Sequence, residues 1–359
     1  MSQRANVIII GGGPTGASAA IVCRQAGLSV AIFEGRDFPR ERPGEALPPG
    51  IELYFDTLEV TRKIVAAGAL RWTGNWMKWG DDCRFIPFGD DENGDPRRGW
   101  QVPRTELDTI LLEQARQLGA TVFQPRIVRD IYRGPKRLAG VITDQGAFAA
   151  DFVIDAGGPR HWLARELGIP IQRFTPKLFG RYGWADGHCP ARQDSALYQS
   201  DALGWTWTSR ISENRYQWTR MTFEKESLGA DWLPEEYRGM TPVGPGRGAD
   251  FTWRRCVQSC GPGYFIAGDA LAATDPIIQQ GVYKGIVSGM KAALVIEEIL
   301  SRGLPEKEGL DQYRQWVDNL YLGDLPLLHG FYSRHPYAPE WARDFRSSVP
   351  TAWATPARL

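Results

Sequence analysis

Three glycines near the start of the chain have the spacing that lets a backbone turn hold a diphosphate. They are Gly11, Gly13 and Gly16, with Pro14 and Thr15 between the last two. In this pattern the first glycine permits a tight turn, the second lets the backbone approach phosphate oxygens, and the third lets helix and strand pack closely. A helix that begins here presents free N–H groups and a positive dipole end to phosphates. The spacing therefore predicts a dinucleotide site at this turn.

The segments around the turn match the structural context that the pattern needs. Residues 7–10 are a continuous β-branched run, which predicts a central strand buried on both faces. Small residues at 17–22 predict a helix, and residues 28–33 predict a second strand that ends on Glu34. A carboxylate at that strand end accepts hydrogen bonds from a ribose diol. Strand, glycines, helix, strand and acid in this order favour the dinucleotide interpretation over a chance turn.

Composition excludes several classes of protein. The formal net charge of the 359 residues is zero, which favours neither a nucleic-acid partner nor a basic membrane patch. No apolar run is long enough to span a membrane. The first predicted strand begins within about six residues of Met1, which leaves no room for a signal peptide, so we expect a cytoplasmic protein.

The cysteines do not predict a disulfide framework or a metal centre. There are five, an odd number, and they are scattered along the chain. This distribution is typical of a reducing compartment. Cys256 and Cys260 are close in sequence, but no further cysteine or histidine cluster completes a zinc shell. We therefore expect no metal site.

A composition change divides the chain. Residues 172–254 read as alternating strands rich in tryptophan and tyrosine, whereas 263–270 return to a buried strand followed by a glycine turn. The sequence predicts an α/β fold in which a split Rossmann-type dinucleotide domain carries an inserted β-sheet substrate domain. The predicted parts are the dinucleotide domain at 1–70, 97–160 and 255–310, the β-rich domain at 71–96 and 161–254, and a C-terminal helix and tail at 311–359.

Only one glycine fingerprint is present, which favours one tightly held flavin, FAD, over a nicotinamide dehydrogenase. Five further segments carry a family resemblance: 42–49, 103–108, 155–158, 268–270 and 275–281. With the fingerprint, they resemble FAD-dependent monooxygenases of the p-hydroxybenzoate hydroxylase fold. The chain is most similar to the branch that contains flavin-dependent halogenases and the flavoprotein maturases of tryptophylquinone-cofactor oxidases.

The resemblance implies roles for individual residues. Arg104 would pair with the diphosphate, and Asp269 would accept hydrogen bonds from the ribityl hydroxyls. Gln280 and Gly281 would begin a helix whose dipole stabilises negative charge on the reduced ring. The full set of predicted FAD contacts is Gly11, Gly13, Pro14, Thr15, Gly16, Glu34, Gly35, Arg36, Arg42, Glu45, Ala46, Arg104, Gly268, Asp269, Pro276, Gln280, Gly281 and Val282.

Four residues are candidates for catalysis. Halogenases of this fold carry a Trp-x-Trp-x-Ile-Pro stretch and a lysine that captures hypohalous acid. Trp205 and Trp207 match the two tryptophans, but Ile-Pro does not follow them. Lys78 is the nearest candidate for the lysine, and we expect its side chain on an exposed strand face, opposite its two neighbours. Glu45 is the remaining candidate, and the sequence identifies no catalytic base. Five tryptophans suit an aromatic pocket: Trp76, Trp79, Trp205, Trp207 and Trp218.

The resemblance implies FAD-dependent oxygenation of an aromatic substrate, in particular a tryptophan side chain of a partner protein during quinone-cofactor maturation. NAD(P)H that docks transiently, or a flavin reductase, would supply the electrons. Three alternatives stay open: a flavin-dependent halogenase, an alkene reductase like the geranylgeranyl reductases, and a flavin-binding interaction protein without catalysis.

Overall fold

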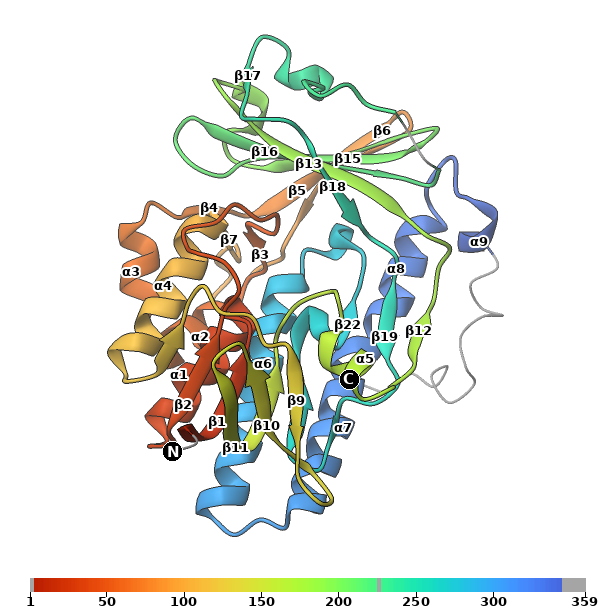
Figure 1. Cartoon of the computed structure of the whole chain (residues 1–359). Helices are drawn as coiled ribbons and strands as arrows, with labels where there is room; N and C mark the ends of the chain where they lie inside the picture. Colours follow the sequence, from red (N-terminus) through yellow and green to blue (C-terminus); the bar gives the residue numbers. More distant parts are fainter. Residues whose placement is uncertain (1–2, 225–226, 344–359) are drawn as a thin grey trace.

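A parallel sheet forms around the first apolar run of the chain. The computed structural model describes residues 3–224 and 227–343, and in it this sheet lies in the lower half of the molecule as drawn in Figure 1. The strand order is β20-β21-β11-β1-β2-β8, and β9 and β10 continue the sheet from β11. The strands are β1 (Gln3–Ile10), β2 (Val30–Phe33), β8 (Thr121–Phe123), β9 (Asp130–Arg133), β10 (Leu138–Thr143), β11 (Gly146–Asp155), β20 (Cys260–Gly261) and β21 (Tyr264–Ile266).

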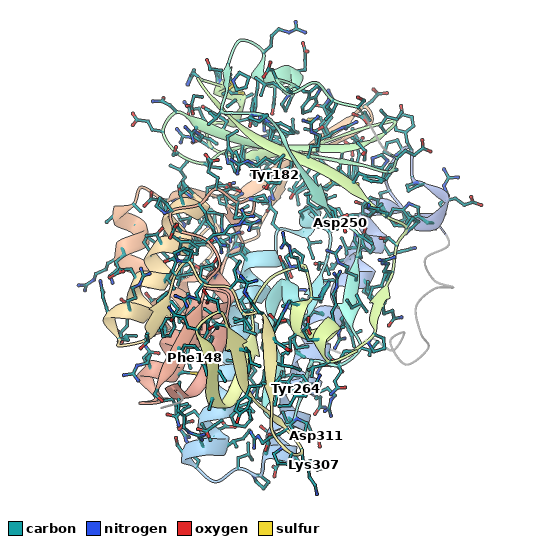
Figure 2. All side chains as sticks on the ribbon, viewed as in Figure 1. Phe148, Tyr182, Asp250, Tyr264, Lys307 and Asp311 are labelled. Carbon is teal, nitrogen blue, oxygen red and sulfur yellow. The ribbon has the colours of Figure 1, made fainter. Side chains whose placement is uncertain are left out.

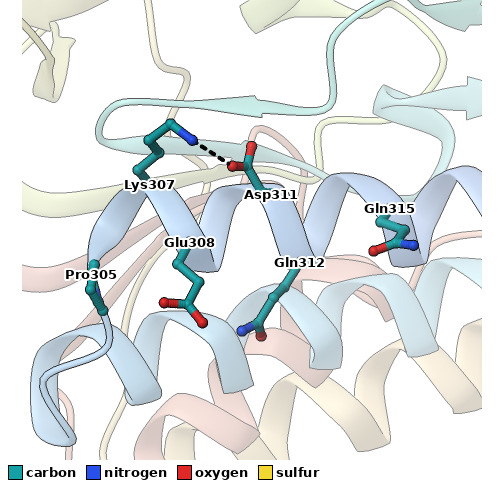
Figure 3. Close-up of a pocket in the computed structure, with 6 residues that line it drawn as sticks. All are labelled: Pro305, Lys307, Glu308, Asp311, Gln312 and Gln315. Atoms are coloured by element: carbon teal, nitrogen blue, oxygen red, sulfur yellow. Dashed lines mark hydrogen bonds and ion pairs between the residues drawn. The ribbon is translucent and has the colours of Figure 1, made fainter.

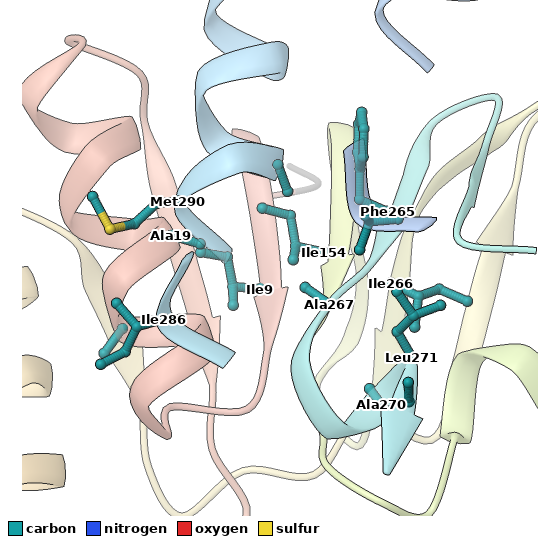
Figure 4. Close-up of a cluster of buried hydrophobic side chains, with 14 of the residues drawn as sticks. Ile9, Ala19, Ile154, Phe265, Ile266, Ala267, Ala270, Leu271, Ile286 and Met290 are labelled. Atoms are coloured by element: carbon teal, nitrogen blue, oxygen red, sulfur yellow. The ribbon is translucent and has the colours of Figure 1, made fainter. Parts of the chain in front are cut away.

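Helices α1 (Pro14–Gln25) and α6 (Gly281–Ser301) pack together over this sheet. Figure 4 shows their apolar side chains, Ala19 from α1 and Ile286 and Met290 from α6, near Ile9 of β1 and Ile154 of β11. Ile9, Ala19, Ile154 and Ile286 are completely buried. The β-branched runs that predicted buried strands therefore form the core that fixes the glycine turn.

A second, mainly antiparallel sheet lies above the first, as Figure 1 shows. Its order is β17-β13-β16-β15-β14-β5-β6, and β18 also pairs with β13. We call it the substrate sheet. Its strands are β5 (Gly74–Trp79), β6 (Asp82–Pro87), β13 (Phe179–Asp186), β14 (Ala196–Asp201), β15 (Gly204–Arg210), β16 (Arg215–Thr222), β17 (Thr241–Pro242) and β18 (Arg247–Asp250).

Two small sheets join the two halves. Strands β3, β7 and β4 form one, and β12, β19 and β22 form the other. Their bounds are β3 (Ala46–Leu47), β4 (Leu70–Trp72), β7 (Gly99–Gln101), β12 (Ile171–Arg173), β19 (Arg254–Cys256) and β22 (Ala272–Ala273). Residues 74–87 and 179–250, far apart in the chain, thus share one sheet, as a split domain requires. The predicted domain boundaries themselves stay predictions.

The remaining helices surround both halves. They are α2 (Glu52–Thr57), α3 (Thr61–Ala66), α4 (Arg104–Gln117), α5 (Trp162–Glu166), α7 (Glu306–Leu322), α8 (Asp324–Tyr332) and α9 (Glu340–Arg343), with short 3-10 turns η1 (Pro190–Arg192), η2 (Glu235–Tyr237), η3 (Gly268–Ala270) and η4 (Pro276–Ile278). The C-terminal part predicted at 311–359 contains most of α7 and all of α8 and α9, and residues 344–359 lie outside the described residues. In the described chain, no helix has the length and apolarity needed to cross a membrane.

Candidate functional site

The glycine turn has the shape that only glycine allows. Gly11 has φ +97°, and a Cβ there would lie 2.5 Å from the carbonyl oxygen of Ala156. A Cβ on Gly16 would lie 1.9 Å from the carbonyl oxygen of Gly11. Pro14 and Thr15 begin helix α1, whose first N–H groups are free for a ligand. The turn at the end of β1 thus has the shape that the predicted diphosphate site requires, and the contact with a diphosphate stays a prediction.

Glu34 closes the turn from the next strand. Its carboxylate accepts hydrogen bonds from the backbone N of Gly12 at 2.8 Å and of Arg36 at 2.9 Å, and it pairs with Arg40 at 3.2 Å. The side chain is almost fully buried. Gly35 follows it and lies against Ile127. Glu34 is thus placed at the strand end expected for a ribose acceptor, and the contact with a ribose stays a prediction.

The arginines near the turn differ in their partners. Arg104, expected at the diphosphate, donates two hydrogen bonds to the carboxylate of Asp108, at 2.6 and 3.0 Å. It also donates to the carbonyl of Pro43 at 2.8 Å. Arg40, which the sequence analysis missed, lies 3.2 Å from the position that a Cβ of Gly13 would occupy. The spacing of four residues between Arg104 and Asp108 was a signal that this arginine would be paired.

Arg42 is a half-buried arginine that has no hydrogen-bond or ion-pair partner in residues 3–224 and 227–343. Burial, with Arg36 and Arg104 nearby, lowers the pKa of Arg42, and Tyr182 and Glu34 act in the opposite direction. A guanidinium with free donors fits a diphosphate, because charge-assisted bonds to phosphate would use those donors.

Asp269 lies where the ends of the parallel strands meet. Its side chain is exposed. Desolvation by the surrounding protein raises its pKa, and Arg104, Arg254 and Arg42 act in the opposite direction. Asp269 follows β21, next to the end of β11, and ligands bind at this edge of open α/β sheets.

Helix α6 packs against η3, the turn that contains Asp269. Gln280 precedes the helix and accepts from the N–H of Lys284 at 2.8 Å, and Gly281 is exposed with open space around it. Val282 lies 3.1 Å from the position that a Cβ of Gly44 would occupy. Pro276 begins η4 after Asp275, whose carboxylate accepts from the N–H of Ile277 at 2.9 Å. Gly281, the first residue of this long helix, is therefore accessible, and its contact with a flavin ring stays a prediction.

Glu45 is a buried carboxyl group between the two halves. Its Oε1 accepts from the indole N–H of Trp184 on β13 at 3.1 Å, and its Oε2 has no partner in the described chain. Burial raises the pKa of Glu45 to about 7, with Trp184 and Arg104 acting in the opposite direction. Ala46 follows in β3 and pairs with Gln101 of β7. Glu45 therefore gains or loses a proton near neutral pH, at the join between the loop and the substrate sheet.

The substrate sheet presents a buried row of side chains to the dinucleotide half. Tyr182, Thr219, Trp207, Tyr198 and Met77 are successive cross-strand partners and share one face. All five are less than one-tenth exposed. Tyr198 donates to the carbonyl of Ile277 in η4 at 2.9 Å. Figure 2 shows Tyr182 where the two layers meet. This inner face is the side from which a substrate would meet the ring of a bound flavin.

The two tryptophans of the halogenase-like stretch share the inner face but differ in their bonding. Trp205 donates to the hydroxyl of Tyr332 on α8 at 3.0 Å, and Tyr332 in turn hydrogen-bonds to Asp275. The indole nitrogen of Trp207 is buried without a partner in the described chain. Trp205 is therefore an anchor between sheet and C-terminal helix.

The other aromatic candidates are divided between two faces. Trp79 shares the inner face, whereas Trp218 packs on Trp232 on the outer face and Trp76 is 36% exposed. Lys78 is exposed, between the buried side chains of Met77 and Trp79. The structure thus does not bring Lys78 together with Trp205 and Trp207, and a single pocket lined by all five predicted tryptophans is wrong.

A surface hollow elsewhere does not belong to this site. It has a volume of about 370 Å³ and is lined by side chains of α7 and the preceding proline, as Figure 3 shows. Lys307 and Asp311 pair there at 3.0 Å. One helix face cannot enclose a ligand, so this hollow carries no candidate chemistry. Among residues 3–224 and 227–343 no group of three acidic, histidine or cysteine side chains could hold a metal ion.

The comparisons with known proteins agree with this geometry. The FAD binding domain family matches residues 4–226, more than half of the chain. The 1H-pyrrole-2-carbonyl-[peptidyl-carrier protein] brominase of Pseudoalteromonas luteoviolacea is 25% identical over 92% of this chain and 88% of its own.

Two solved structures show the same fold. A myxobacterial chondrochloren halogenase superposes with a TM-score of 0.83 at 22% identity, over 93% of this chain and 83% of that one. PqsL, a probable FAD-dependent monooxygenase from Pseudomonas aeruginosa, gives 0.81 at 16% identity, over 96% and 99%. The predicted α/β fold and the predicted cofactor are confirmed. The chain therefore belongs to the FAD binding domain family and is an FAD-dependent oxidoreductase.

Proposed function

We propose that the chain is an FAD-dependent monooxygenase that hydroxylates an aromatic ring, and that its substrate is a tryptophan side chain of a partner protein. The observation that carries the choice of hydroxylation is the placement of the lysines. Lys284 is the one lysine in the described chain that is fully buried, and it is ion-paired with Asp324. Lys78 is exposed on the substrate sheet, on the face opposite Met77 and Trp79. No described lysine is therefore free at the inner face to capture hypohalous acid.

The chain's own residues would do three things for this reaction. Bound FAD supplies the chemistry of oxygen activation. Arg42 and the N–H groups at Gly13 would hold its diphosphate, while the N-terminus of α6 would stabilise negative charge on the reduced ring. The buried inner face of the substrate sheet, around Trp207 and Tyr198, would keep water from the reacting ring.

Glu45 would hold a proton beside that face. Because the indole N–H of Trp184 donates to Oε1, a proton on Glu45 is favoured on Oε2. A pKa near 7 makes the carboxyl able to give and take this proton at neutral pH.

A protein substrate is supported by a relative that acts on a ring carried by another protein. The brominase from Pseudoalteromonas luteoviolacea is named for a pyrrole carbonyl attached to a peptidyl carrier protein. The present chain shares most of its length with that relative. Delivery of an aromatic ring by a protein is therefore compatible with this fold.

Oxygen-18 labelling tests the proposal. The FAD-loaded protein is reduced with dithionite, freed of excess reductant, and mixed with ¹⁸O₂ and a tryptophan-containing protein substrate. We expect one labelled oxygen per product hydroxyl, measured by mass spectrometry. Products without label would exclude monooxygenation.

Halogenation is the second candidate, since the matching curated relatives include several halogenases. Bromide, added to the same mixture at millimolar concentration, distinguishes halogenation from hydroxylation. A product mass that rises by the mass of one bromine less one hydrogen, only when bromide is present, would establish the halogenase.

A further inference from the structure

Strand β6 is an open edge of the substrate sheet. It pairs with β5 and with no other strand in the described chain. All six of its residues are exposed. One side of its backbone therefore presents unpaired N–H and C=O groups, which can accept another strand.

Apolar side chains accompany this edge. Trp76 of β5 and Phe85 of β6 are direct cross-strand partners with ring centroids 5.5 Å apart. They are 36% and 38% exposed, and the neighbouring Ile86 is 37% exposed. Ile86 points to the opposite face of the sheet from Trp76 and Phe85. Exposed large apolar side chains on both faces of an unprotected edge are a feature of sites that bind a further strand or peptide.

Ile86 lies at the end of the hairpin that adjoins the FAD-binding half. Ile86 is the cross-strand partner of Asn75, and Asn75 donates to Gln279 at 3.3 Å. Gln279 belongs to the segment that leads into α6, where the ring of the flavin is expected. A strand added along β6 would therefore run past the join between the substrate sheet and the FAD-binding half.

Negative charge lies at both ends of β6. Residues 81–98 contain six carboxylates and three arginines. Asp81 precedes the strand and Asp82 begins it, whereas Asp90, Asp91, Glu92 and Asp95 follow it and outnumber Arg97 and Arg98. Arg84 pairs with Asp82 at 3.6 Å, and because both side chains are exposed this ion pair contributes little to stability. The surface thus favours an occupant with basic residues on either side of an apolar centre.

We propose that β6, residues 82–87, docks an extended segment of the partner protein by strand addition, with apolar side chains at its centre and lysine or arginine at its ends. This inference rests on the proposed function for the identity of the partner as the protein substrate. Main-chain hydrogen bonds would give the affinity, and Trp76 and Phe85 would select the apolar centre.

The probes are two peptides that differ only at their ends. Each has an alternating valine and threonine sequence with one central tryptophan, flanked either by lysines or by glutamates, and carries a fluorescent label. Binding to the FAD-loaded full chain is measured by fluorescence anisotropy without reductant, so no reaction occurs. We expect the lysine-flanked peptide to bind about tenfold more tightly, a preference that weakens in high salt.

One variant separates strand addition from charge attraction. Ile86→Glu adds a negative charge, so a purely electrostatic surface would bind the lysine-flanked peptide more tightly. Strand addition with apolar contact predicts instead about a tenfold loss. The matched control is Tyr132→Glu, on the exposed edge strand β9 of the other sheet, where the side chain is 42% exposed. We expect no change there.

Three results would overturn the inference: no binding of either peptide to the unmodified chain, no loss in Ile86→Glu, or an equal loss in both variants. The labelling experiment is independent of this one. Label in the product with no peptide binding at β6 would refute the docking edge alone. Binding at β6 with no label would refute monooxygenation and leave the docking edge standing.

Discussion

The indole N–H of Trp184 donates to Oε1 of Glu45 at 3.1 Å, and this bond links the substrate sheet to the loop that leads into β3. Both side chains are less than one-twentieth exposed. An indole N–H is a donor only, so it fixes which carboxylate oxygen remains available. The bond therefore orients a titratable group where the two halves of the molecule meet.

Substitution of Glu45 by glutamine should make stability less dependent on pH. The pKa of Glu45 is raised from 4.5 to about 7 by burial, partly opposed by Trp184 and Arg104, so the folded state holds a proton that the unfolded state releases. Its contribution to stability is complete below pH 4.5 and is lost as pH rises through 7. Between pH 5 and 8 we expect the unmodified chain to lose about 1–3 kcal/mol more unfolding free energy than Glu45→Gln.

Urea unfolding of the FAD-saturated protein at both pH values measures this difference. Glu92→Gln, an exposed loop residue, is the matched control and should behave as the unmodified chain does. If Glu45→Gln kept the same pH dependence, the raised pKa of Glu45 would be wrong.

Gly13→Val should reduce FAD binding while the chain still folds. A Cβ at this position would meet only the end of the Arg40 side chain, at 3.2 Å, so the fold has room for it. The added methyl groups would, however, occupy the space in which phosphate oxygens approach the backbone.

We expect the bound FAD, measured by absorbance after gel filtration, to fall at least tenfold with an unchanged far-UV circular dichroism spectrum. Gly229→Ala, at an exposed glycine with open space around it, is the control. Full FAD occupancy in Gly13→Val would place the diphosphate elsewhere.

Arg42→Met should weaken FAD binding and leave the unfolding free energy of the FAD-free protein nearly unchanged. Arg42 has no partner in the described chain and its charge lies beside Arg36 and Arg104, so its removal relieves repulsion in the FAD-free protein. In the complex it removes charge-assisted bonds worth about 1.5–3 kcal/mol, or roughly ten- to a hundredfold in affinity. Isothermal titration with FAD at two salt concentrations measures the loss and its screening. Arg129→Met, an exposed arginine, should leave affinity unchanged.

The glycine turn, the split sheet and the cofactor were predictable because they depend on local rules. Gly11 and Gly16 allow the tight turn and the close packing of a strand–turn–helix unit. Runs of β-branched residues are typical of buried parallel strands. The alternation of side chains in a strand likewise predicted that Trp205 and Trp207 share a face and that Lys78 faces away from its neighbours.

The features of the site that the sequence did not predict depend on contacts between segments far apart in the chain. Nothing near Glu45 in the chain indicates that Trp184, on a different sheet, donates to it. Alternation along β5 already separates Trp76 from Trp79. The place of Trp218 on the face opposite Trp207 follows from the register of β15 and β16, which the sequence does not specify. Arg40 was overlooked because its importance arises from the path of the loop over Gly13.

Trp205→Phe should destabilise the chain through its C-terminal helix. Trp205 is 1% exposed, and its N–H donates to the hydroxyl of Tyr332, which also bonds to Asp275. Loss of ring volume and of this bond should lower the unfolding free energy by about 2–4 kcal/mol. Trp76→Phe, at an exposed tryptophan, should change it by less than about 0.5 kcal/mol. Chemical denaturation compares the two, and equal effects would contradict an anchoring role for Trp205.

Lys78→Ala provides the sharpest separation of hydroxylation from halogenation. Lys78 lies opposite exposed Gln199 on the outer face of β5, so the ammonium group is directed away from the inner face of the sheet. We expect the rate of product formation to stay within about twofold of the unmodified chain, since a surface substitution of this kind removes no buried contact. Product formation is followed by mass spectrometry with and without bromide. A loss of product in Lys78→Ala that appears only when bromide is present would show that Lys78 takes part in the reaction. That result would favour a halogenase.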